Sequence, residues 1–110
     1  MLAVILGAFA AHGLKKSLSA DLLTVFYTAV QYHFYHALGL LAVGLIATQV
    51  PASGWIKLSA WLMFTGIVLF SGSLYLLAVS GIRWLGMITP VGGVCFILAW
   101  MSVAVAILKK

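Results

Sequence analysis

The 110-residue chain has very few charged side chains. Lys and Arg together number six, Asp21 is the single acidic residue, and charged residues make up 6% of the chain against 65% hydrophobic residues. A soluble domain of ~100 residues leaves roughly 40% of its unfolded surface in water, and covering that surface needs many more polar side chains. The shortage of charge excludes an ordinary soluble domain and predicts an all-α integral membrane protein whose solvent is the lipid bilayer.

The scarcity of acids and thiols also limits the chemistry. A single carboxylate leaves no acid pair, and the lone Cys95 has no partner for a disulfide within one chain. The sequence contains no HExxH motif and no phosphate-binding glycine loop, and it shows no arrangement typical of a Ser-His-Asp triad. We therefore expect no recognisable catalytic constellation, no cofactor, and a protein that is not an enzyme.

The positive charge is scattered along the chain. The formal net charge is +5, and the basic residues lie between apolar runs or at the chain end: Lys15, Lys16, Lys57, Arg83, Lys109 and Lys110. Loops and membrane exits carry positive charge in this way, whereas nucleic-acid binding needs basic residues gathered on one surface. The expected surroundings are the lipid bilayer and other membrane protein chains, with no nucleic acid.

Apolar runs separated by short polar breaks predict one transmembrane helical domain over residues 1–110. The predicted segments are 1–11, 22–49, 55–79 and 84–108, with a helix break around residues 51–54. Eleven helical residues rise ~16 Å, about half of the ~30 Å hydrocarbon core, so the first helix is expected to be short or truncated at its N-terminus. Only residues 80–83 separate the last two segments, which predicts an antiparallel hairpin within a four-helix transmembrane bundle.

A polar cluster is predicted inside the membrane. It consists of His12, Thr28, Gln31, Tyr32, Tyr35 and His36. At about 100° per residue the second-segment members share one face, with His36 at its edge and His33 further round. Polar groups at membrane depth are costly without partners, so this face should point at another helix, a cavity or the headgroups. Interhelical hydrogen bonding is the simplest interpretation, and a binding or transport site is the alternative.

The histidines raise the question of a metal site. His33 and His36 stand three residues apart on a predicted helix, and His12 could add a third imidazole if the first two segments pack together. Because few side chains could orient such ligands, we expect no tightly bound metal. We expect His36 to face the interior, in a hydrogen-bond network with the first or third segment.

Small residues recur in the last two segments and predict close helix packing. The candidates are Gly66, Ser71, Gly72, Ser73, Gly86, Pro90, Gly92 and Gly93. Small side chains let transmembrane backbones approach closely, so Gly72 and Gly93 are expected to leave no room for a bulky side chain. Pro90 lies inside an apolar run, where it would remove a backbone hydrogen bond and kink the helix near Gly86.

Four stretches of the chain resemble a known family. Residues 7–15, 28–38, 69–75 and 83–93 are similar to the small bacterial inner-membrane proteins typified by YgdD, whose eukaryotic relatives are called transmembrane protein 256. The resemblance implies a four-helix protein of the inner (plasma) membrane in a family of unknown function, with further residues before Gly7. The basic residues divide three against three between the two membrane faces, so only the resemblance favours cytoplasmic termini.

Three functions are compatible with these patterns. The preferred one is a structural or accessory subunit that packs in a homo-oligomer or a larger membrane complex through its glycine and serine faces. The second is a small channel or transporter for an ion or small solute, built on the polar face of the second segment and the Pro90 kink. The third is a metal- or proton-handling site at His12, His33 and His36.

Overall fold

The computed structural model describes residues 1–50 and 54–109. The elements in chain order are α1 (Leu2–His12), η1 (Leu14–Lys16), α2 (Ala20–Ala47), α3 (Gly54–Gly66), η2 (Ile67–Ser71), α4 (Gly72–Ser80), η3 (Arg83–Met87) and α5 (Thr89–Leu108). Elements η1 and η3 are 3₁₀ helices, and η2 is a π-helix. Helix is the only regular structure across the described ranges, so the predicted all-α fold class is confirmed.

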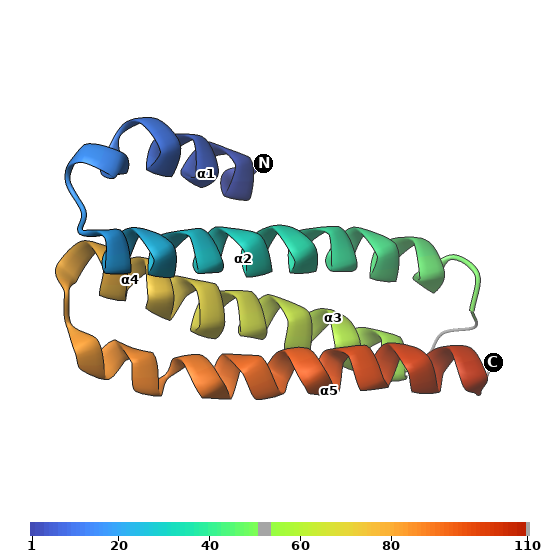
Figure 1. The fold of residues 1–110 in the computed structure, drawn as a ribbon. Coiled ribbons are helices and arrows are strands. Elements are labelled where there is room, and N and C mark those ends of the chain that lie inside the picture. Colours follow the sequence, from blue (N-terminus) through green and yellow to red (C-terminus); the bar gives the residue numbers. More distant parts are fainter. Residues whose placement is uncertain (51–53, 110) are drawn as a thin grey trace.

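Three helical stretches in the described ranges are long and apolar enough to cross a membrane. They are Ala20–Ala47, Gly54–Ser80 and Arg83–Leu108. Figure 1 shows α1 beside the first part of α2, with α3, α4 and α5 on the opposite side of α2. The last two spans run antiparallel, and α5 packs along α3, as the predicted hairpin requires. The chain is therefore a four-helix membrane bundle with a short first helix.

The helix ends follow from local capping chemistry. Helix α2 begins at Ala20, two residues before the predicted start, because the Ser19 side chain accepts a hydrogen bond from the Leu22 backbone N–H at 3.3 Å. Helix α4 ends at Ser80 because Gly81 adopts a left-handed conformation with φ of +73°. Residues 51–53 of the predicted break, and Lys110, lie outside the described residues.

The inner face of α2 follows a three-four spacing. We call this face the inner seam, and its members are Phe26, Ala29, His33, His36, Leu40 and Val43. Near one end, Phe26 packs with Ala10 and Ala78, and near the other, Val43 packs with Met63 and other residues of α3 and α5. The inner seam thus joins two apolar clusters, with both histidines of α2 between them.

Pro90 starts a helix and does not kink one, which corrects the sequence prediction. The chain forms the 3₁₀ helix η3 after Arg83, and α5 begins at Thr89 with Pro90 in its first turn. Backbone N–H groups in a first turn have no helical acceptor, so proline costs no hydrogen bond there. The last span therefore changes from 3₁₀ to α geometry just before Pro90.

Candidate functional site at the middle of the bundle

Side chains of three spans form a polar layer between the two apolar clusters. We define the polar layer as His33, His36, Ser71, Ser73, Tyr75, Thr89 and Trp100. Each member hydrogen-bonds to another span of the bundle. Such bonds replace the water that polar groups lack at membrane depth, so the layer ties α2, the α3–η2–α4 span and α5 together.

His36 is buried and has both ring nitrogens occupied. The Trp100 indole N–H donates to His36 Nε2 at 3.0 Å, and His36 Nδ1 lies 2.8 Å from the Tyr32 carbonyl oxygen. An indole only donates and a carbonyl only accepts, so the ring must be neutral with its proton on Nδ1. The ring also stacks on Phe96 with centroids 3.5 Å apart. His36 therefore serves as a junction between α2 and α5.

His33 makes the second contact of α2 through its ring. His33 Nδ1 lies 2.8 Å from the Tyr75 hydroxyl of α4, and the Tyr75 ring packs on Phe26 at a centroid distance of 5.0 Å. Two histidines three residues apart therefore reach two different spans. The sequence prediction placed His36 against the first or third segment, whereas its side-chain partner is Trp100 of α5, and His33 is the histidine that reaches α4.

The π-helix η2 is held by hydroxyl groups. The fully buried Ser71 donates to the Ala29 carbonyl oxygen of α2 at 2.8 Å. Ser73 donates to the Phe70 carbonyl oxygen at 2.9 Å and lies 2.6 Å from the Thr89 hydroxyl, which is left to act as donor. A π-turn disturbs the regular backbone ladder, and these hydroxyls provide bonds around it.

Two of the predicted packing glycines make the tightest contacts, and they are not the pair, Gly72 and Gly93, that was expected to leave no room for a bulky side chain. A Cβ on Gly92 would lie 2.4 Å from the Phe70 backbone nitrogen, and a Cβ on Gly66 would lie 2.5 Å from the Phe96 ring. The expected pair has space instead: the nearest atoms to a Cβ would be 4.0 Å away at Gly72 and 3.9 Å away at Gly93.

The remaining packing candidate, Gly86, makes an ordinary contact, because a Cβ there would lie 3.4 Å from Leu77. One glycine outside the predicted set also matters. A Cβ on Gly39 of α2 would lie 3.0 Å from the Met63 sulfur and 3.2 Å from the Trp100 ring. Gly39 thus leaves the space in which Trp100 reaches His36.

The predicted polar residues of α2 divide between two sides of the helix: His36 faces the interior, as expected, whereas Gln31 and Tyr35 face away from the other helices. Gln31 is exposed and Tyr35 is 56% exposed, while Tyr32 lies at the edge of the interior with 39% of its surface exposed. Thr28 is half-buried and its hydroxyl donates to the Thr24 carbonyl within the same helix. The predicted face therefore covers part of the outer side of α2 and reaches the inner seam only at His36, while His33 of the inner seam lies outside it.

The three histidines do not come together. His12 is exposed at the end of α1, and His33 and His36 turn toward Tyr75 and Trp100. Among residues 1–50 and 54–109, no group of three or more His, Cys, Asp or Glu side chains is placed to hold a metal ion. A three-imidazole site within one chain does not form in this arrangement.

An apolar groove opens beside the polar layer, between α2 and α5. We call it the aromatic groove, and its volume is about 550 Å³. The lining residues are Tyr32, His36, Phe70, Pro90, Gly93, Val94, Phe96, Ile97 and Trp100. The space left by Gly93 opens part of its floor, since a Cβ there would meet only the Phe70 ring at 3.9 Å.

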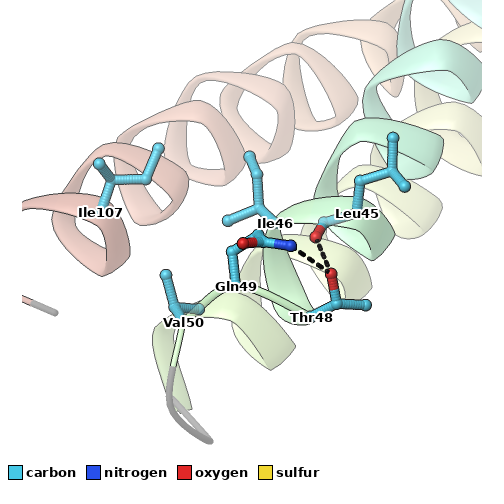
Figure 2. A pocket seen from close by; sticks show the side chains of 6 residues that line it. All are labelled: Leu45, Ile46, Thr48, Gln49, Val50 and Ile107. Carbon is cyan, nitrogen blue, oxygen red and sulfur yellow. Dashed lines mark hydrogen bonds between the residues drawn. The ribbon is translucent and has the colours of Figure 1, made fainter.

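A second, smaller pocket of about 310 Å³ lies at the carboxyl end of α2 (Figure 2). Thr48 donates to the Leu45 carbonyl at 2.7 Å, and the Gln49 amide donates to the Thr48 hydroxyl at 3.3 Å. These bonds satisfy groups at a helix terminus, where carbonyls lack helical partners. Ile46, Val50 and Ile107 complete the lining, so the pocket is apolar apart from the helix end.

Comparison with known proteins identifies relatives over nearly the whole chain. The family described as "Protein of unknown function (DUF423)" matches residues 6–93. The UPF0382 membrane protein YwdK of Bacillus subtilis is 53% identical over 99% of this chain and 89% of its own length. The UPF0382 membrane protein of Staphylococcus saprophyticus is 49% identical over the same shares, and that of Haemophilus influenzae is 42% identical over 97% of this chain and 85% of its own length. No solved structure matches.

Proposed function

Since the chain belongs to the DUF423 family, whose curated relatives are named UPF0382 membrane proteins, we propose that it is a structural or accessory subunit that assembles with other protein chains in the membrane. The proposal includes a single transmembrane domain over residues 1–110 in the bacterial inner membrane, with no catalytic role of its own. It also places the proteins typified by YgdD, and transmembrane protein 256, among the relatives.

The observation that carries the proposal is the contrast between the polar groups inside and outside the bundle. Inside, the polar layer is engaged in bonds between spans. In the part of the chain that the structure describes, Ser59 is the one half-buried or buried residue with a fully buried side-chain polar atom that lacks a partner. Outside, the Gln31 amide and Tyr35 hydroxyl have no hydrogen bond within the described chain. Polar groups directed into lipid call for a protein partner.

Native mass spectrometry of the protein extracted gently from its membrane tests this function. We expect particles with a fixed number of protein chains, either copies of this chain alone or copies with a second membrane protein at constant stoichiometry. A strictly monomeric protein at all concentrations, with crosslinking in intact membranes also giving only the monomer, would overturn the proposal.

A second function, binding or transport of a small solute, is supported by the aromatic groove beside the π-helix. Short π-helical turns are frequent at functional sites, and Phe70 of η2 lines the groove. The test is the Gly93→Phe variant, whose added ring would occupy the groove that Tyr32, Phe70 and Phe96 line. A small molecule that stays bound to the native protein and is lost from this variant would favour binding, whereas equal spectra for both would exclude it.

A further inference from the structure

Helix α2 carries a second row of residues at seven-residue spacing on the side opposite the bundle. We call this row the outer seam, and its members are Thr28, Gln31, Tyr35, Leu38, Ala42 and Leu45. All of them are exposed except Thr28, which is half-buried. Alternating steps of three and four residues keep such a row on one side of a helix, and this pattern lets two helices pack along their length.

If α2 crosses the bilayer along its axis, Gln31 and Tyr35 of the outer seam lie within the hydrocarbon core. The 28 residues of α2 span ~42 Å, with Gln31 ~16 Å and Tyr35 ~22 Å from its start. A core of ~30 Å placed anywhere along this helix, in line with its axis, includes both positions. Neither headgroups nor bulk water can therefore solvate these side chains in an isolated chain.

Among these side chains, the exposed amide of Gln31 has the most hydrogen-bonding groups to satisfy. It carries two donor hydrogens and a carbonyl acceptor, and none of them has a partner in the described chain. Lipid tails offer neither donor nor acceptor, and an unpaired amide in an apolar medium is costly. A partner that packs on the outer seam must therefore offer both hydrogen-bond donors and hydrogen-bond acceptors beside Gln31 and Tyr35.

We propose that two copies of this chain associate in parallel through the outer seams of their α2 helices, with Gln31 bonded to Gln31 across a two-fold axis. This proposal rests on the function proposed above and names the partner. A primary amide is complementary to another primary amide, and a tyrosine hydroxyl both donates and accepts, so one patch can satisfy its own copy. Leu38, Ala42 and Leu45 continue the contact as apolar positions of the same row.

The rest of the bundle leaves this side of α2 open. Helix α1 packs on a neighbouring side, where a Cβ on Gly7 would lie 3.2 Å from Val30, and it runs beside only the first part of α2 (Figure 1). The α3–η2–α4 span packs along the inner seam, and Trp100 of α5 reaches it at His36. The outer seam also carries no formal charge, so two parallel copies bring no like charges together in the core.

Disulfide crosslinking in intact membranes tests the contact. In a Cys95→Ser background, Gln31→Cys and Tyr35→Cys should each form a dimer on mild oxidation. The matched control is Phe64→Cys, an exposed residue of α3 in the lipid-facing surface, which should stay monomeric. Equal crosslinking at all three positions, or none at residues 31 and 35, would overturn the proposal.

A second measurement keeps the inference separate from the proposed function. In the otherwise native protein, Gln31→Leu should weaken self-association in liposomes, measured by energy transfer between labelled chains, by roughly three- to tenfold, the effect of one interhelical hydrogen bond. Gln31→Asn retains an amide and should lose less. Unchanged association in Gln31→Leu would show that the copies meet elsewhere, which overturns this contact but leaves a subunit role intact. Absence of any association in the native chain would count against a homo-oligomer, and the mass spectra would then decide the subunit role.

Discussion

The inner and outer seams of α2 use the same three-four spacing but differ in how their polar groups are satisfied. On the inner seam, His33 and His36 each bond a side chain of another span. On the outer seam, Gln31 and Tyr35 have no hydrogen-bond partner in the described chain. The four residues lie within about one and a half turns of α2, so they differ mainly in the protein that surrounds them. The comparison teaches that polar spacing alone does not say which side of a membrane helix faces its own bundle.

We expect the largest loss of stability from a substitution at Gly92, which lies inside the bundle where α5 meets η2. Gly92→Ala should destabilise the bundle by roughly 2–3 kcal/mol, because the added methyl group meets the Phe70 backbone, which cannot rotate away as a side chain could. Thermal unfolding in detergent measures the loss. Gly44→Ala is the matched control, because a Cβ at Gly44 meets nothing within 4 Å. Equal melting temperatures for the two variants would contradict the close approach of η2 and α5.

The hydroxyl that joins the π-helix to α2 should have the next largest effect. Ser71→Ala removes the bond to the Ala29 carbonyl and should cost about 1–1.5 kcal/mol, near the upper end measured for interhelical bonds in membranes, because Ser71 is fully buried. Ser102→Ala is the control, since its buried hydroxyl bonds only the Leu98 carbonyl of its own helix. If Ser102→Ala lost as much stability as Ser71→Ala, the hydrogen bond between spans would contribute no more to stability than one within a single helix.

The bond between Trp100 and His36 should contribute less. Trp100→Phe keeps an aromatic ring in the space left by Gly39 but removes the only donor to His36 Nε2, at an expected cost of about 0.6 kcal/mol. Thermal unfolding in detergent again provides the measurement, with Trp61→Phe, an exposed residue of α3, as control. If Trp100→Phe matched the control, the ring contact and not the hydrogen bond would hold α5 to α2.

The general architecture could be predicted from the sequence because it depends on length and hydropathy. Apolar runs of more than twenty residues gave three spans within about two residues of their ends, and residues 80–83 were too short for anything but a hairpin. The 3₁₀ start of the last span was missed, since Pro90 is equally compatible with a kinked helix and with the first turn of a new one.

The site was harder to predict because it depends on which face of α2 is inside. Polarity predicted that the face of Gln31 and Tyr35, with His36 at its edge, would meet another helix, a cavity or the headgroups, and only His36 is buried. The seven-residue spacing of Phe26, Ala29 and His33 can be seen in the sequence. The outer seam has the same spacing, however, so spacing alone does not identify the buried face. Likewise, glycine spacing does not show which glycine faces a backbone, so Gly66 and Gly92 could be separated from Gly72 and Gly93 only by coordinates.

The smallest effect is expected on the outer seam, when stability is measured on a single chain. In dilute detergent, where copies are separated, Gln31→Leu should change the free energy of unfolding by less than about 0.5 kcal/mol, because the side chain has no partner within the described chain. His36→Leu is the contrasting variant on the inner seam, because it leaves the Trp100 donor without its acceptor. Thermal unfolding of both at equal dilution measures the difference. A loss in Gln31→Leu as large as that in His36→Leu would mean that the outer seam is part of the fold itself, and the distinction between the two seams would be wrong.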